Sequence, residues 1–171
     1  MILETIRMVA DALASSTYGV NVQLATLPVD GTDTIAPDIA TIVDETRSDE
    51  VAVGRYPTAL PCLIVTQNRS LTVQGDIASD NRDGEVTILI RYITTETGTA
   101  QANTWVLYTL RAIQRALRQF NTNAHAADRN RGYIQNIECL SMEVVEVFEN
   151  IDDAHITGGL KATFKVRDTL P

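Results

Sequence analysis

The sequence has few cysteines and no long apolar run, and each absence excludes a class of protein. Its 171 residues contain two cysteines, Cys62 and Cys139, which lie far apart and form no Cys-x-x-Cys pair. This pattern excludes a disulfide framework and a zinc ribbon, so we expect both cysteines to be reduced residues of the core. No stretch reaches the roughly eighteen apolar residues of a membrane-spanning helix.

The first residues also lack the features of a secretory signal. Residues 1–7 include an acid, Glu4, and no basic segment that leads into an apolar run. Because a signal peptide needs both a basic start and an apolar stretch, we expect the protein to stay in the reducing cytosol where it is made.

Basic residues are scarce. The chain has 22 acidic and 14 basic residues, which gives a formal net charge of -8. A free-standing nucleic-acid binder gains most of its affinity by neutralising phosphates, so this charge disfavours that function. Hydrophobic residues make up 44% and charged residues 21% of the chain, which excludes wholesale disorder. A chain of this length fits one domain whose hydrophobic core needs no disulfides or metal ions to stabilise it.

Motifs of catalysis and cofactor binding are missing as well. The sequence contains no G-x-x-x-x-G-K-S/T, no G-x-G-x-x-G and no G-x-S-x-G. His125 and His155 fall in expected loops without metal-ligand spacing, where we expect them to be solvated. Residues 79–84 resemble the start of a calcium loop, but the twelfth position is Ile90, which cannot coordinate calcium. We therefore predict a hairpin turn at 79–84, and no enzyme activity, catalytic residue, metal site or cofactor.

Apolar periodicity predicts two amphipathic helices. The first covers residues 2–13, with apolar residues three or four positions apart at Ile2, Ile6, Val9 and Leu13. We expect it to end in the segment 15–19, where Gly19 can take the left-handed conformation of a helix C-terminus. The second covers residues 101–120, and its core stripe consists of Val106, Leu110, Ile113, Leu117 and Phe120.

A short apolar run predicts a strand over 61–66. Residues that alternate between two faces predict further strands over 85–95, 134–149 and 156–167. A change of face near Met142 indicates a bulge, and residues 20–24 are expected to form a short strand or extended arm. Residues 28–60 are irregular and acidic, with at most one amphipathic turn near Ile42. A stretch of this length is usually functional or disordered. We expect one α+β domain over 1–171, in which an antiparallel or mixed sheet carries the N-terminal and central helices on one face.

Charge is unevenly distributed in the second half of the chain. Residues 111–131 hold five arginines and one aspartate, whereas residues 138–153 hold six acids and no base. We name Arg111, Arg115 and Arg118 the arginine row, and Glu143, Glu146 and Glu149 the acidic strand. Three interpretations stay open: two solvated faces, complementary patches that meet across subunits, or an arginine row against DNA phosphates. Twelve of the fourteen basic residues are arginine, the cation enriched at interfaces.

The order of these elements resembles the tail terminator, or tail-completion, proteins of tailed bacteriophages and the closely similar neck proteins. These small acidic α+β proteins have an opening helix, a proline-led strand, a strand that runs into a central helix, and a closing antiparallel pair. The corresponding segments are 2–13, 61–65, 85–120, and 134–149 with 156–167. The resemblance covers most of the chain and concerns pattern and order, without a diagnostic motif; the acidic segment 28–57 is longer than in the family's smaller members.

The resemblance implies a structural virion protein, located in the tail or neck after assembly in the host cytoplasm. Family members form a ring, usually a hexamer, that caps the tail tube, ends its polymerisation and provides the head-tail joining surface. The implied partners are further copies of the chain, the tail tube protein, the head-tail connector or stopper protein and, in contractile tails, the sheath protein. DNA would pass through the ring without sequence-specific binding, and no membrane is involved.

Ring contacts are head-to-tail, so each subunit needs two different patches. The arginine row and the acidic strand are the candidates, on charge pattern alone. An alternative function is a head-tail connector or adaptor, or a small assembly chaperone, that acts as a monomer or dimer and uses its acidic segment to bind a basic partner. A hydrolase with scattered catalytic residues is a more distant alternative.

Overall fold

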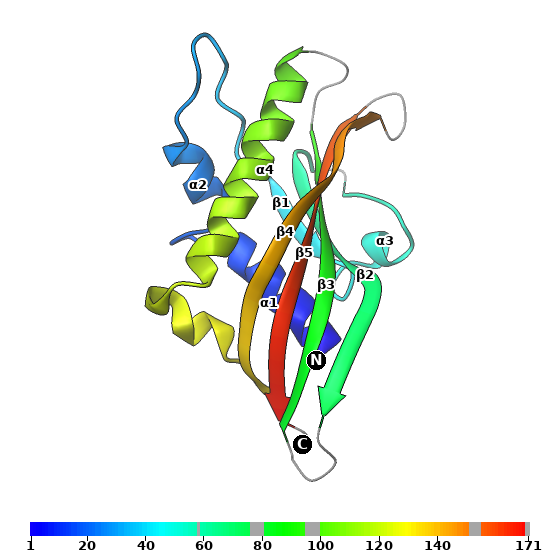
Figure 1. Cartoon of the computed structure of the whole chain (residues 1–171). Coiled ribbons are helices and arrows are strands. Elements are labelled where there is room, and N and C mark those ends of the chain that lie inside the picture. Colours follow the sequence, from blue (N-terminus) through cyan, green and yellow to red (C-terminus); the bar gives the residue numbers. More distant parts are fainter. Residues whose placement is uncertain (58, 76–80, 95–99, 151–154, 170–171) are drawn as a thin grey trace.

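The computed structural model describes residues 1–57, 59–75, 81–94, 100–150 and 155–169. Within these ranges the chain forms a mixed five-stranded sheet in the order β1-β2-β3-β5-β4 (Figure 1). The strands are β1 Thr41–Asp44, β2 Cys62–Gly75, β3 Asn81–Ile93, β4 Ile134–Asn150 and β5 Ile156–Thr169. The helices are α1 Ile2–Leu13, α2 Val20–Thr26, α3 Asp49–Ala52 and α4 Ala100–Phe120, followed by the 3₁₀ helix η1 Asn123–Arg129. The predicted α+β class is confirmed.

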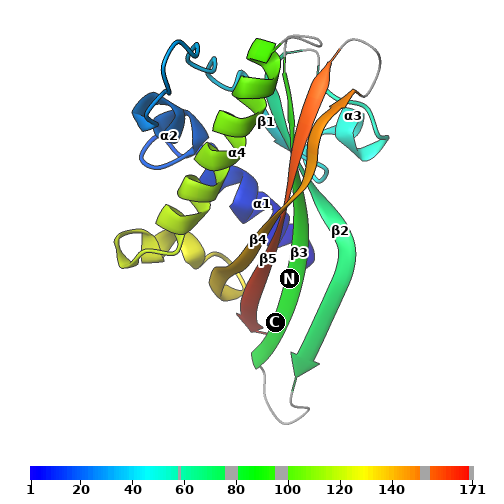
Figure 2. The same ribbon diagram turned by 45° about the horizontal axis from the view of Figure 1, so that its top comes forward.

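The two long helices cover one face of the sheet, as predicted. The five residues of the core stripe of α4 are all buried, and the stripe packs with the inward side chains of β3 and β5. Both views of the ribbon place α1, α2 and α4 on this side of the sheet and α3 on the other (Figures 1 and 2). Cysteine burial is also as predicted, since Cys62 and Cys139 are both buried and reduced.

The other face of the sheet carries a smaller apolar cluster. Successive strand residues point to opposite faces, so Cys62 and Ile64 point away from the face that Leu63 and Val65 share with the main core. They pack there with Ile93 and with Val51 of α3. The β5 residue Thr157 is also buried on this side, where it lies opposite Ile93 in the ladder.

The segment after α1 differs from the prediction. The helix ends at Leu13, but its C-cap is Ala14 in the right-handed region, and Gly19 instead precedes α2 with φ -63°. Gly19 is needed for space, because a Cβ there would lie 2.3 Å from the carbonyl oxygen of Ser15. Residues 20–26 form a helix rather than a strand, since Val20 and Leu24 lie one turn apart and are both buried in the main core.

The acidic segment is more regular than predicted. Residues 41–44, near the expected amphipathic turn, form β1, which pairs in parallel with β2. A short helix, α3, follows, with Ser48 accepting a hydrogen bond from the backbone N–H of Val51. We name residues 28–40 the acidic loop; it lies outside helices and strands but is tied to α2 and α4 by specific hydrogen bonds.

Three side chains fix the acidic loop. The hydroxyl of Tyr108 donates to Asp33 Oδ2 at 3.0 Å and accepts from the backbone N–H of Asp30 at 2.8 Å. Trp105 Nε1 donates to Thr34 Oγ1 at 3.2 Å. At the far end the amide of Asn21 bonds both the N–H and the carbonyl of Ile39, at 2.7 and 3.2 Å.

We expect Tyr108→Phe to loosen the acidic loop without unfolding the domain. The substitution keeps the buried ring but removes two hydrogen bonds, which costs about 1–2 kcal/mol of local stability because water can replace part of them. Faster amide hydrogen exchange over residues 28–36, with little change elsewhere, would be the expected readout. Tyr133→Phe is the control, because that tyrosine is exposed; equal exchange in both variants would contradict the anchoring role.

Strands β2 and β3 extend beyond the apolar segments from which they were predicted. β2 continues to Gly75 and β3 begins at Asn81, so the predicted hairpin turn at 79–84 is wrong for residues 81–84. These residues are held by a partner strand on each side, and Asp83 forms an ion pair with Arg167 at 2.8 Å. Residues 79 and 80 lie outside the described residues. The bulge expected near Met142 is confirmed by a register shift between Cys139 and Ser141, one of several in β4.

Candidate subunit and partner interface

The arginine row lies on the outer face of α4. The apolar stripe of the helix points to the sheet, and side chains at the remaining positions therefore point away from it. Arg111 and Arg118 are exposed and Arg115 is half-buried, and none of the three makes an ion pair or hydrogen bond with a described residue. One turn before Arg111, Leu107 lies on the same face with 48% of its surface exposed.

The other two arginines of this basic segment have structural partners. Arg129 donates from Nη1 to the carbonyl of Phe120 at 3.1 Å, which satisfies a carbonyl at the end of α4. Arg131 forms an ion pair with Asp11 of α1, and Arg47 bonds the same carboxylate at 2.6 Å. The five arginines read as one basic region in the sequence therefore divide into two structural residues and three outward-facing ones.

Glu143, the member of the acidic strand whose side chain the structure describes, lies on the sheet face away from α4. Met142 packs against the main core, and the neighbouring Glu143 is exposed on the opposite face. Glu143 stands opposite Lys161 in the ladder, and Glu138 stands opposite Lys165. β5 thus places a lysine opposite two of the six acids of residues 138–153, and opposite charges at cross-strand positions are favourable.

The remaining members of the acidic strand are placed by backbone register alone. Glu146 lies opposite Gly159 and Glu149 opposite Thr157, while their side chains fall outside what the structure describes. The structure therefore does not bring the arginine row and Glu143 together within one subunit; it places them on opposite sides. This arrangement leaves the two patches able to meet only between copies.

Strand β4 also presents an apolar surface that the sequence did not reveal. Four of its apolar residues are 41–49% exposed: Leu140, Val144, Val145 and Val147. β4 pairs with β5 alone among the described strands, so it is an edge strand. Its bulges and acidic residues are features that protect an edge from uncontrolled pairing, and apolar side chains grouped on it are typical of an interface.

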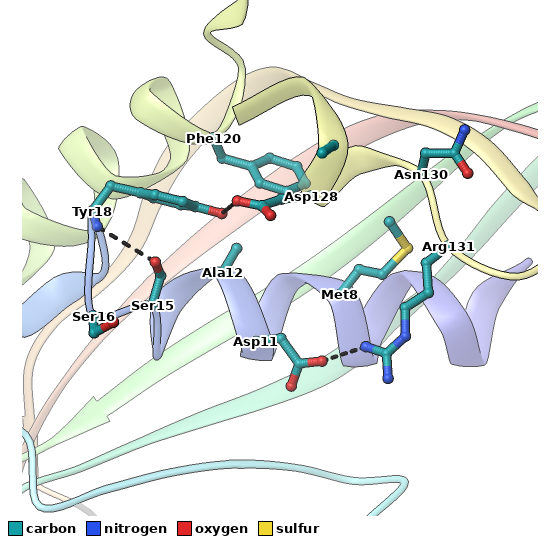
Figure 3. A pocket seen from close by; sticks show the side chains of 11 residues that line it. Met8, Asp11, Ala12, Ser15, Ser16, Tyr18, Phe120, Asp128, Asn130 and Arg131 are labelled. Carbon is teal, nitrogen blue, oxygen red and sulfur yellow. Dashed lines mark hydrogen bonds and ion pairs between the residues drawn. The ribbon is translucent and has the colours of Figure 1, made fainter. Parts of the chain in front are cut away.

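A surface cavity of about 410 Å³ lies between α1 and the segment around η1 (Figure 3). Its apolar lining includes Met8, Ala12 and Phe120, and its polar groups include Asp11, Asp128 and Arg131. The cavity is the candidate for small-molecule chemistry, which would require polar groups that are free to bind a ligand.

The polar groups of the cavity are bound to one another. Tyr18 donates to Asp128 Oδ2 at 3.0 Å, and burial raises the pKa of the Tyr18 hydroxyl above its ordinary value. Ser15 Oγ accepts from the backbone N–H groups of Thr17 and Tyr18. His125 was predicted to be a solvated loop residue, and this is wrong. Its ring packs on the ring of Tyr18, with 4.1 Å between the ring centroids. This arrangement holds η1 against α1.

The remaining candidate groups give no reactive cluster. His155, also expected to be solvated, is half-buried and lies edge-on to Tyr56. Burial raises the pKa of Cys62 to about 12 and that of Cys139 to about 11, so neither thiol is an ionised nucleophile at neutral pH. In the part of the chain that the structure describes, no three His, Cys, Asp or Glu residues are placed to hold a metal ion, and no helix is long and apolar enough to cross a membrane.

Asp11 links α1 to two other segments and should make stability depend on pH. The hydrogen-bonded guanidinium of Arg47 lowers the pKa of Asp11, and Arg131 adds to the effect. A carboxylate with a lowered folded pKa contributes stability above its unfolded pKa of about 4, and this contribution is lost as pH falls through the folded value.

We therefore expect Asp11→Asn to be less stable than the parent protein at pH 7 and equally stable near pH 2. The difference at pH 7 should be at most about 1 kcal/mol, because the pairs are partly exposed to solvent. Urea unfolding at the two pH values measures it. Asp38→Asn, at an exposed site, serves as control, and a difference that persists unchanged at the low pH would show that shape rather than charge is responsible.

Comparison with known proteins adds no relative, because no family model matches the chain and a search of curated proteins found no significant match. The function of the chain must therefore be inferred from its own structure.

Proposed function

We propose that the chain is a structural protein of the tail-terminator type, whose copies join head-to-tail into a ring. The ring would cap a phage tail tube, end its polymerisation and provide the surface that joins the tail to the head. The observation that carries this proposal is that one subunit has two different unsatisfied surfaces on separate elements. One is the arginine row on the outer face of α4, and the other is the exposed edge of β4.

A closed ring requires this kind of asymmetry. In a head-to-tail contact each subunit uses one patch toward the next copy and a different patch toward the previous copy, whereas a two-fold dimer uses one patch twice. A cap must also bind the subunit-binding surface at the end of a tube, and its own outer face must not present that surface again. An apolar edge strand and a row of arginines meet the compositional pattern of such interfaces.

The proposed partners follow from this role. They are the tail tube protein on one face of the ring, the head-tail connector or stopper protein on the other, and the sheath protein if the tail is contractile. DNA would pass through the opening, and a subunit with net charge -8 favours passage over retention because it does not neutralise phosphates.

The monomeric adaptor or chaperone has less support. That alternative uses the acidic segment as an arm that binds a basic partner. The anchors at Asn21, Trp105 and Tyr108 instead hold the acidic loop on the domain, which removes the freedom that a wrapping arm needs.

The mass of the purified chain in solution tests the proposal. Light scattering behind a sizing column should give about 112 kDa for a hexamer of 18.7 kDa subunits, and electron microscopy should show rings. A mass of one or two chains at every protein concentration and at both low and moderate salt would contradict a self-assembling ring and favour the adaptor.

A further inference from the structure

We infer that the arginine row of one subunit binds the acidic loop of the next subunit, and not its acidic strand. The inference rests on the proposed ring and names the patch that completes its contact. The sequence alone pairs the arginine row with the longest acidic run, but the structure gives that run bases of its own.

Strand β5 places lysines beside the acidic strand within the same subunit. Lys161 stands opposite Glu143 in the ladder, and Lys165 lies between Glu138 on β4 and Glu85 on β3. Binding three arginines there would place them beside these lysines, and like charges at an interface oppose association. The arginines of a neighbour would therefore meet lysine as well as glutamate on this strand.

The acidic loop has no such compensation. Asp30, Asp33 and Asp38 lie within it, and no basic residue occurs between Arg7 and Arg47. Asp30 and Asp38 are exposed, and their carboxylates make no ion pair or hydrogen bond with a described residue. Between them Ile35 is 69% exposed, an apolar side chain within an acidic loop.

The loop and the arginine row match in composition. Three carboxylates beside an exposed isoleucine would face three guanidinium groups beside the exposed Leu107. Arginine binds carboxylates through paired hydrogen bonds, and an apolar contact next to such pairs is typical of an interface. Since the anchors at Asn21, Trp105 and Tyr108 already order the loop, docking loses less conformational entropy than it would for a free segment.

The position of the loop also suits a contact between copies. Within its own subunit it is tied to the first half of α4, at Trp105 and Tyr108, whereas the arginine row occupies the second half of that helix. No hydrogen bond or ion pair joins the described residues of the loop to the row. A subunit thus carries both halves of the contact separately, as a head-to-tail interface requires.

Charge reversal in separate chains tests the inference. One chain carries Arg111→Glu, Arg115→Glu and Arg118→Glu (the row-reversed chain), and the other carries Asp30→Lys and Asp38→Lys (the loop-reversed chain). Asp33 is kept because Tyr108 binds it. Each chain alone should have the mass of a monomer, since every contact meets like charge. An equimolar mixture should recover the ring mass, because the two chains can alternate with each contact matched in sign.

Two comparisons separate the outcomes. Asp49→Lys with Glu50→Lys makes the same charge change on α3, on the other side of the sheet, and should keep the ring. Glu143→Lys should also keep it. If Glu143→Lys disrupts the ring while the loop-reversed chain assembles normally, the loop inference is wrong and the proposed ring stands. If the parent chain never assembles, the proposed function fails and the inference fails with it.

Discussion

Reversing the whole arginine row is expected to convert the proposed ring into single chains that remain folded. Arg111, Arg115 and Arg118 lie off the apolar stripe of α4 and have no ionic partner among the described residues, so the monomer loses no internal ion pair or hydrogen bond. Three acidic side chains in their place would instead repel an acidic patch of the neighbour. Like charge at an interface costs several kcal/mol, which raises the dissociation constant of each contact about a hundredfold or more.

The experiment combines a mass with a melting curve. Light scattering should show a monomer, and the circular dichroism spectrum and unfolding midpoint should match those of the parent protein measured as a monomer. Replacing the same three residues by lysine should weaken the ring less, because lysine keeps the charge but loses the paired hydrogen bonds of the guanidinium. Arg55→Glu is the control for charge alone, since Arg55 is exposed beyond α3. A ring that survives the triple reversal would mean that the row is only a solvated face.

Local periodicity was enough to find the two long helices. The apolar spacing of residues 2–13 gave α1 with both ends correct, and the stripe from Val106 to Phe120 gave α4 to within a residue. In these helices the positions that pack are three or four residues apart, so the sequence itself contains the pattern. The outward direction of the arginine row follows from the same pattern.

Elements that depend on distant partners were missed. Val20, Val22 and Leu24 fit alternation, and Val20 and Leu24 also fit a helical turn; the choice of helix is made by packing in the core with α4. β1 exists because residues 41–44 pair in parallel with β2, about twenty positions later in the chain. Nothing within four residues of sequence specifies such a partner.

The candidate interface also combines features that the local sequence predicts with features that depend on distant parts of the chain. The sequence located both charged segments but could not show that Lys161 stands opposite Glu143, because that pairing depends on the register of β4 and β5. It also gave no sign that Val144 and Val147 are exposed, since it could not show that β4 is an edge strand. Surfaces that join subunits depend on which positions the fold leaves uncovered, and periodicity does not reveal this.

The close approach of α4 to the sheet depends on Gly158 of β5. A glycine inside a strand is unfavourable for the strand itself, and it often marks a place where another element comes near. A Cβ at this position would lie 2.5 Å from Val106 Cγ1 and 3.4 Å from Leu110 Cδ1. Since valine is stiff about χ1, Val106 cannot move aside without shifting the helix that carries the arginine row.

We therefore expect Gly158→Ala to reduce the free energy of unfolding by about 2 kcal/mol, the cost of inserting a methyl group into a packed core. Val106→Ala removes the clashing methyl groups, so Gly158→Ala should cost much less in that background, with a coupling of about 1–2 kcal/mol in the double-mutant cycle. Urea unfolding of the four proteins measures the cycle. If the two substitutions are additive, the glycine is not what sets the distance between helix and sheet. If they are coupled, Gly158→Ala should also weaken ring assembly, and Val106→Ala should restore it, because the position of α4 fixes where the arginine row meets its neighbour.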